Sequence, residues 1–345
     1  SKAINLRVLG KQVQWLAKYQ PPEQELPPRL KLTWLTVKLA EANHRGVVNA
    51  YSIQEFKELG ERLFKEDAPL VCWASLHLAV QYTNAFDFEK AAEAIAGWEA
   101  IPPEVPGLKY YGQMLSTKGQ HLAFTGRLSE AREYFKQAIK AFSELSDPTE
   151  AEGNINQTRA YLLTVMMDLP ETDHTQIDQE MHAYFGMPIL EAAESFAADA
   201  SDGKKYQHHI LLRFLAIRPG HPAAAAYLAR QEEWSEGCGH PWPLILFYRA
   251  MLIQTESTRL ELLQKAIRLI DDDHPGITLA FIKTVRAGAH YACNQAAKEE
   301  FVACLEAVRP KLPMLQDAFR ILDEHLACPM EPLKLLQLTL SFNFR

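Results

Sequence analysis

The feature that most constrains this chain is a spacing of small and large apolar residues that recurs after about forty positions. Small residues allow the two helices of a hairpin to cross closely, while larger ones fill the groove to the next hairpin. An interval of this length favours hairpins that each pack on their neighbours over one compact core. The clearest copy lies within residues 112–148 and comprises Gly119, Leu122, Gly126, Leu128, Ala131, Phe135, Ala138 and Pro148.

Further copies follow the same spacing with decreasing fidelity. Downstream by 41 residues, Ala160 and Leu163 match the first helix, but the second helix departs from the pattern around Pro170. About forty residues upstream the matching positions hold Ala79, Tyr82, Phe88, Ala91, Ile95, Trp98 and Pro103. Near the C-terminus a looser copy comprises Gly288, Tyr291, Cys304 and Ala307, and Ala250, 38 residues before Gly288, is a candidate start of another hairpin.

This spacing resembles the tetratricopeptide (TPR) motif, and residues 125–139 carry the most specific part of the resemblance. The interval, longer than in the standard motif, is similar to that of the divergent TPR domains in bacterial regulators of the maltose-activator and peptide-pheromone-receptor types. The resemblance implies an all-α fold of antiparallel helix hairpins stacked into a right-handed solenoid. It also implies that the first helix of each hairpin lines a concave surface.

Helical periodicity and turn residues predict about sixteen helices and almost no strand. The first helices are expected at residues 1–20, at 28–43 after Pro27, and from the capping box at residues 52–55. The last eight residues alternate apolar and polar, so they are a short strand or a tail. We expect three parts: a basic helical module at residues 1–66, TPR-like repeats at 67–200, and further TPR-like repeats at 201–345.

Charge is distributed unevenly along the chain. The first 48 residues carry a net charge of +5 and the remainder −12, which gives −7 overall. Basic side chains that simply face solvent explain this pattern, and so does a basic module that meets an acidic partner or a second copy of the chain. The overall negative charge makes nucleic acid an unlikely partner for the chain as a whole. No apolar run is long enough to predict a membrane span.

The five cysteines are scattered and mostly have apolar neighbours (Cys72, Cys238, Cys293, Cys304 and Cys328). Such a pattern predicts five free thiols rather than a disulfide framework, and hence a cytoplasmic protein.

Motifs for catalysis, metals or cofactors are nearly absent, so the sequence predicts no cofactor, no metal site and no enzyme. Residues 238–240, 208–209 and 271–274 contain candidate ligands, but each fits an ordinary turn or helix start better. Arg320 and His325 match the Arg-x4-His spacing of the helical HEPN ribonucleases, although helix geometry places the two side chains on different faces.

The predicted binding face follows from the TPR grid, which places two groups of neutral polar residues on first helices. Amides and hydroxyls of this kind can donate and accept hydrogen bonds along an extended peptide backbone. They are also ordinary solvent-facing helix residues, and both interpretations stay open. The preceding repeat presents Trp73, Leu76, His77 and Val80, which are more apolar and could be covered by the N-terminal helices. The predicted site comprises Gln113, Ser116, Thr117, Gln120, Asn154, Gln157, Thr158 and Tyr161.

The sequence therefore predicts a non-catalytic scaffold that binds a protein or peptide along the concave face. The alternative is the sensor or oligomerisation part of a larger bacterial signalling or transcription regulator. A chain that begins at Ser1 is compatible with both a processed protein and an excised domain. A HEPN-like ribonuclease is the remaining alternative.

Overall fold

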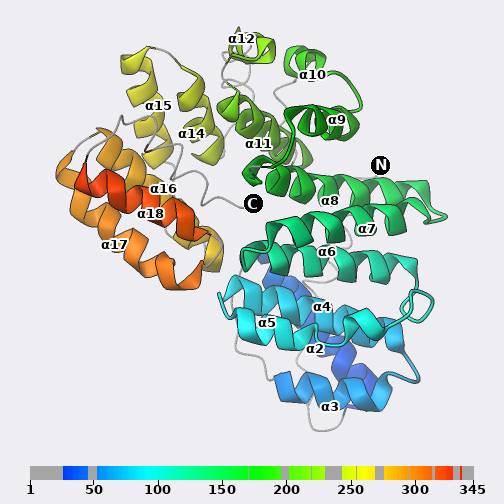
Figure 1. Cartoon of the computed structure of the whole chain (residues 1–345). Coiled ribbons are helices and arrows are strands. Elements are labelled where there is room, and N and C mark those ends of the chain that lie inside the picture. Colours follow the sequence, from blue (N-terminus) through cyan, green and yellow to red (C-terminus); the bar gives the residue numbers. More distant parts are fainter. Residues whose placement is uncertain are drawn as a thin grey trace. The chain divides into compact units, whose positions relative to one another are not determined.

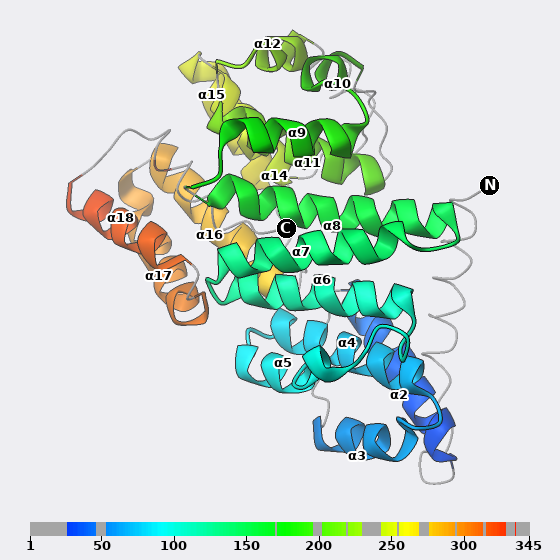
Figure 2. The same ribbon diagram turned by 45° about the vertical axis from the view of Figure 1, so that its right-hand side comes forward.

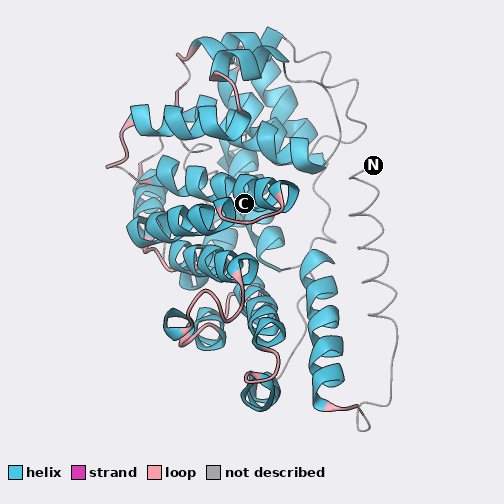
Figure 3. Ribbon diagram, turned by 90° about the vertical axis from the view of Figure 1, so that its right-hand side faces the viewer, coloured by secondary structure: helices cyan, strands magenta, loops and turns pink. Residues whose placement is uncertain are grey.

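The computed structural model describes residues 26–45, 53–169, 171–195, 202–218, 220–229, 243–253, 255–268, 276–293, 295–312, 315–328 and 335. Within these ranges it contains sixteen α-helices, three short 3-10 helices and no strand (Figures 1 and 3). The predicted all-α class is confirmed. The expected helix at residues 1–20 and the alternating tail at 338–345 lie outside the described residues.

The chain divides into two compact units, which are described separately. Unit 1 comprises residues 1–125, 133–155 and 274–278, and unit 2 comprises residues 126–132, 156–273 and 279–345. The division falls within three helices, α7 (Leu128–Ser143), α8 (Pro148–Asp168) and α16 (Gly276–Cys293). The three-part division expected from the sequence stays a prediction.

Unit 1 is built around α4, which packs against a helix on each side and against both neighbouring short helices (Figures 1 and 2). Its elements are α2 (Pro28–Arg45), α3 (Ile53–Leu63), α4 (Ala68–Asn84), α5 (Phe88–Ala94), the 3-10 helix η2 (Trp98–Ala100), α6 (Leu108–Phe124) and parts of α7, α8 and α16. Helix α2 extends two residues beyond the predicted end at Asn43, and α3 begins inside the predicted capping box.

Two apolar clusters hold unit 1 together. The first joins α2, α3 and α4 and includes Leu39, Phe56 and Leu78. The second joins α4 to η2 and α6 and includes Trp98 and Met114. Each helix thus buries apolar side chains against its neighbours, which is the main stabilising contribution in a helical fold.

Aspartates begin four of the helices. The carboxylates of Asp67 and Asp87 accept hydrogen bonds from backbone N–H groups in the first turns of α4 and α5. Asp147 does the same at the start of α8, and Asp173 at the start of α9 (His174–Phe185). An acidic N-cap satisfies N–H groups that have no partner within the helix and stabilises the helix dipole.

In the α6–α7 hairpin, where the sequence match is best, two glycines of α6 lie in close contact with aromatic rings of α7. A Cβ atom built on Gly119 would lie 2.8 Å from the ring of Phe135, and one on Gly112 would lie 2.6 Å from the ring of Phe142. Ala131 and Phe135 are fully buried. Only glycine therefore lets the two helices approach this closely.

Unit 2 contains the remaining helices, in which α9 packs on α10, α10 on α12, α11 on α14, and α14 on α15. The bounds are α10 (Ile189–Ser195), α11 (Asp202–Ile217), α12 (Pro222–Ala229), α14 (Pro243–Leu252), α15 (Glu256–Arg268), α16 (Gly276–Cys293), η3 (Gln295–Ala297), α17 (Lys298–Val308), η4 (Arg309–Lys311) and α18 (Gln316–Ala327). Residues 210–216 of α11 are buried on every side, and Arg213 among them pairs with Asp168.

The residues of the looser C-terminal copy are buried on α16 but not on α17. Gly288 and Tyr291 are buried as expected, but Ala307 is exposed and Cys304 is only half-buried. The buried face of α17 instead consists of Phe301, Leu305 and Val308, which follow each other at helical spacing. The larger apolar side chains take the core positions because they remove more surface from water.

Candidate functional site

The predicted site begins where α6 runs in register with the first two turns of α8, both within unit 1. Lys109 of α6 forms an ion pair with Glu150 of α8. One helical turn further along, the Gln113 Nε2 donates a hydrogen bond of 3.5 Å to the Asn154 Oδ1, across a separation of 41 residues. The ion pair joins residues at the same separation, so the 41-residue offset read from the sequence is the structural register of α6 against α8.

The Asn154 side chain makes a short hydrogen bond to its own helix and a longer one to Gln113. The Asn154 Nδ2 donates to the backbone oxygen of Glu150 at 2.8 Å, which orients the side chain along its own helix. The contact from Gln113 is at the long limit for a hydrogen bond, and both residues are half-buried.

Three of the predicted site residues do not face solvent. Ser116 is 9% exposed, Thr117 is 7% exposed and Thr158 is 2% exposed. These hydroxyl side chains are small enough to fit between packed helices, so their polarity gave the wrong prediction of exposure. They cannot contact a ligand in this conformation.

The remaining predicted residues are accessible. Gln120 on α6 is half-buried, like Gln113. On α8, in the part that belongs to unit 2, Gln157 is exposed and its Nε2 donates to the Tyr161 Oη at 3.1 Å. This contact joins residues one helical turn apart and holds the tyrosine hydroxyl at the helix surface.

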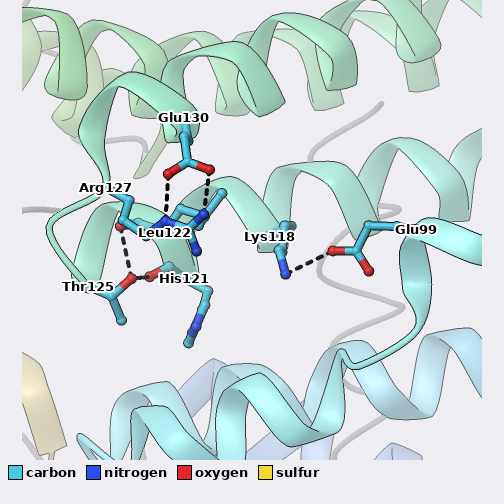
Figure 4. A network of polar contacts seen from close by, with 7 residues as sticks. All are labelled: Glu99, Lys118, His121, Leu122, Thr125, Arg127 and Glu130. Atoms are coloured by element: carbon cyan, nitrogen blue, oxygen red, sulfur yellow. Dashed lines mark hydrogen bonds and ion pairs between the residues drawn. The ribbon is translucent and has the colours of Figure 1, made fainter.

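Charged side chains also flank α6, and the sequence analysis missed them. Lys118 pairs with Glu99 of η2 at 2.9 Å, and this hydrogen bond lowers the pKa of the Glu99 carboxyl (Figure 4). At the end of the helix the Thr125 Oγ1 donates to the backbone oxygens of His121 and Leu122, as Figure 4 also shows. Opposite charges at a separation of nineteen residues carry no periodic signal, so only the fold reveals the pair.

The preceding repeat forms a part-buried polar contact between α4 and the N-terminal helix α2, the side on which the sequence analysis expected it to be covered. The Asn43 Nδ2 of α2 donates to the backbone oxygen of His77 at 2.8 Å and approaches the His77 Nδ1 at 3.4 Å. The Gln81 Nε2 completes the group by donating to the Asn43 Oδ1 at 2.7 Å. Burial lowers the pKa of His77 to about 4, so the imidazole is neutral at pH 7.

The other residues of that repeat are, like His77, only partly buried. Trp73, Leu76 and Val80 all have intermediate exposure, and the ring of Trp73 packs edge-on against the ring of His77. Because α2 contacts α4 extensively, this repeat offers little free polar surface. The amides of Gln113 and Gln120 on α6 and Asn154 on α8, all in unit 1 and called the amide row below, are therefore the better candidate for binding.

Candidate catalytic and metal-binding groups do not assemble in the described part of the chain. No group of three or more His, Cys, Asp or Glu side chains suited to a metal is found among the described residues. The exposed Arg320 pairs with Glu324, whereas His325 is buried against the ring of Tyr291. The two residues of the ribonuclease-like spacing thus lie on different faces of α18.

Several sequence candidates lie where the structure gives no side-chain description. Residues 238–240 and 271–274 are outside the described residues, and so are the side chains of residues 208–209. Cys72 is a buried free thiol, Cys304 is half-buried and Cys328 is exposed, each without a disulfide. Cys238 and the side chain of Cys293 are not described.

None of the described helices combines the length and the apolar character that crossing a membrane requires. Comparison of the chain with family models, with curated proteins and with solved structures gave no match.

Proposed function

We propose that the chain is a non-catalytic scaffold that binds an extended protein segment along the amide row of α6 and α8, in a TPR-like stack of helical hairpins. The constant register of α6 against α8 is the observation that carries the proposal. Two rungs, Lys109 with Glu150 and Gln113 with Asn154, lie one helical turn apart. Parallel helices with a constant offset are what a stack of equivalent hairpins produces.

Other contacts between helices support the stack. Within unit 1, Gln81 bonds Asn43 across 38 residues and Lys57 pairs with Glu93 across 36 residues. Within unit 2, Arg218 bonds Asp178 across 40 residues. Side chains that meet at about one repeat length favour a structure in which each hairpin packs on the next.

The chemistry of the row fits a peptide backbone. A primary amide offers N–H donors and a carbonyl acceptor, so it can match both the C=O and the N–H of an extended segment. Side chains of the ligand would not need to be recognised for this binding mode. The neighbouring ion pairs add charge at the edges of the row, where they restrict which segments can lie there.

The proposal is tested with short peptides of random sequence displayed on an array. The best binder is then titrated by fluorescence anisotropy against the wild-type chain and against a variant that carries Gln113→Ala and Asn154→Ala. Each lost hydrogen bond contributes about 0.5–1.5 kcal/mol, so the double variant should bind roughly tenfold more weakly. Gln137→Ala, which removes an exposed amide on α7, is the matched control and should bind like wild type.

A second measurement tests the binding mode. Methylation of successive backbone nitrogens of the peptide removes its donors while retaining its side chains. We expect weaker binding to wild type and little further loss for the double variant. Equal affinities of wild type and double variant, with both proteins folded, would show that the amide row is not the site. Absence of any binder on the array would count against the peptide-binding function itself.

A further inference from the structure

The turn between α4 and α5 has an unusual backbone. Phe86 has a φ of 59°, and it is the only residue other than glycine with a positive φ among the described residues. The others with positive φ are Gly97, Gly107, Gly126 and Gly186. A side chain with a Cβ atom is strained in this left-handed conformation, and an aromatic one is an outlier.

Hydrogen bonds identify the turn as a Schellman motif, the common way to end a helix. The N–H of Asp87 donates to the oxygen of Tyr82 at 2.9 Å, and the N–H of Phe86 donates to the oxygen of Thr83 at 3.1 Å. Phe86 is therefore the left-handed residue of the motif, a position that glycine usually occupies. In the next repeat, forty residues on, Gly126 takes the corresponding place with a φ of 84°.

The ring of Phe86 starts a run of aromatic side chains from this turn to the end of α6. It packs edge-on against the ring of Phe88, with centroids 6.4 Å apart. The ring of Phe88 in turn stacks on that of Phe124 at 6.0 Å and an angle of 21°. Phe124 is the last residue of α6 and is 1% exposed. Phe86 is thus connected through the Phe88 ring to Phe124, where the α4–α5 hairpin meets α6.

We infer that Phe86 is a positioning residue, whose ring fixes the C-terminal end of α6 against the α4–α5 turn. Glycine would remove the strain but also the first ring of the run, and this packing offsets the strained backbone. Because α6 carries Gln113 and Gln120, the value of this positioning for binding rests on the proposed function. The backbone strain at Phe86 and the aromatic contacts at the junction do not depend on the proposed function.

The experiment needs no ligand and compares three substitutions at one position. Phe86→Gly removes both strain and ring, Phe86→Ala removes the ring while the left-handed backbone stays unfavourable, and Phe86→Tyr retains the ring. Urea unfolding measures global stability. Hydrogen exchange followed by mass spectrometry measures local opening of residues 118–124 in α6, with residues 210–216 of α11 as the internal control.

Two results are expected. Phe86→Ala should have an unfolding equilibrium constant about fivefold or more above that of Phe86→Gly, because only glycine relieves the left-handed strain. In Phe86→Gly the amides of residues 118–124 should exchange roughly tenfold faster than in wild type, while α11 is unchanged and Phe86→Tyr resembles wild type.

The inference would be overturned by wild-type exchange of α6 in Phe86→Gly, since the ring would then hold nothing in place. Equal stability of the alanine and glycine variants would equally contradict the strain. If Phe86→Ala does not fold, the glycine and tyrosine variants still decide the positioning role. Failure of the peptide experiment would leave all of these outcomes as they are, so the two proposals can fail separately.

Discussion

Helices α6 and α7 form one hairpin but bury their side chains in different ways. On α7, the exposed residues Glu133, Lys136 and Gln137 surround a buried face that includes Ala131 and Phe135. On α6, by contrast, every residue from 108 to 124 is buried or half-buried. Helix α7 thus has a solvent side, whereas α6 has neighbours or partial cover all around.

This difference shows what a polar side chain means on each helix. On α7 polar side chains are exposed to solvent, as amphipathic periodicity predicts. On α6 the hydroxyls of Ser116 and Thr117 lie in the interior, and the half-buried amides lie in register with α8. Helix α4 resembles α6, since none of its described side chains is exposed. In this hairpin, polarity is therefore a reliable guide to exposure on α7 but not on α6.

The largest effect is expected on the buried face of α7. Phe135→Ala removes a fully buried ring and should lower the free energy of unfolding by about 3–5 kcal/mol. Its exposed neighbour provides the control, because Lys136→Ala should change stability by no more than about 0.5 kcal/mol. Urea unfolding of both variants measures the contrast between the two faces, and similar losses for both would refute it.

The next effect concerns His77 on α4 and depends on pH. The pKa of His77 is about 4 in the folded chain, below its usual value of 6.5, because burial disfavours the charged form. The folded state then binds fewer protons than the unfolded state between these values, so this contribution to stability is complete above pH 6.5 and is lost as pH falls towards 4. The maximum loss is about 3 kcal/mol.

Substitution separates His77 from the other titrating groups. In His77→Gln the stability difference from wild type should change between pH 7 and pH 4, with wild type losing more on acidification. Unfolding curves at several pH values measure it. Parallel pH profiles for the two proteins would show that His77 is not buried as a neutral ring.

A smaller loss is expected where α6 meets α7. Gly119→Leu places a side chain where even a Cβ atom would contact the Phe135 ring, so it should destabilise the chain by about 1–3 kcal/mol. Gln137→Leu adds a similar side chain to the exposed face of α7 and should have little effect. Adding Phe135→Leu to Gly119→Leu should restore part of the loss, and strictly additive effects of the two changes would contradict the close approach.

The smallest effect tests the interior hydroxyls of α6. Ser116→Ala should lower stability by at most about 1.5 kcal/mol, the upper range for one hydrogen bond, because it removes a buried hydroxyl. It should leave peptide affinity unchanged, in contrast to Gln113→Ala with Asn154→Ala. If Ser116→Ala has wild-type stability but binds the peptide more weakly, Ser116 belongs to the binding site.

Local signals predicted much of the fold. The close approach at Gly119, the end of α6 before Gly126 and the start of α8 at Pro148 all follow from residues that act on their own neighbourhood. The all-α class follows from periodicity over many such segments. These features were accessible because steric and capping preferences are properties of short stretches.

Other features depend on the arrangement of distant segments. The burial of Thr158, the pairing of Asn43 with His77 and the exposure of Ala307 are decided by which helix packs alongside. The left-handed Phe86 runs against the local preference for glycine, so no single-sequence rule would place it there. For the candidate site, the sequence supplied the amides and their register but not the depth at which each side chain lies.

The register of α6 against α8 also sets the timing of folding during synthesis. Gln113 and its partner Asn154 are 41 residues apart. At about 5–20 residues per second, the partner follows from the ribosome roughly 2–8 s later. Contacts with such short sequence separation close small loops, which is the condition for fast folding. If translation pauses after α6, the face of α6 that packs against α8 stays uncovered for as long as the pause lasts. The helices synthesised earlier keep their contacts meanwhile.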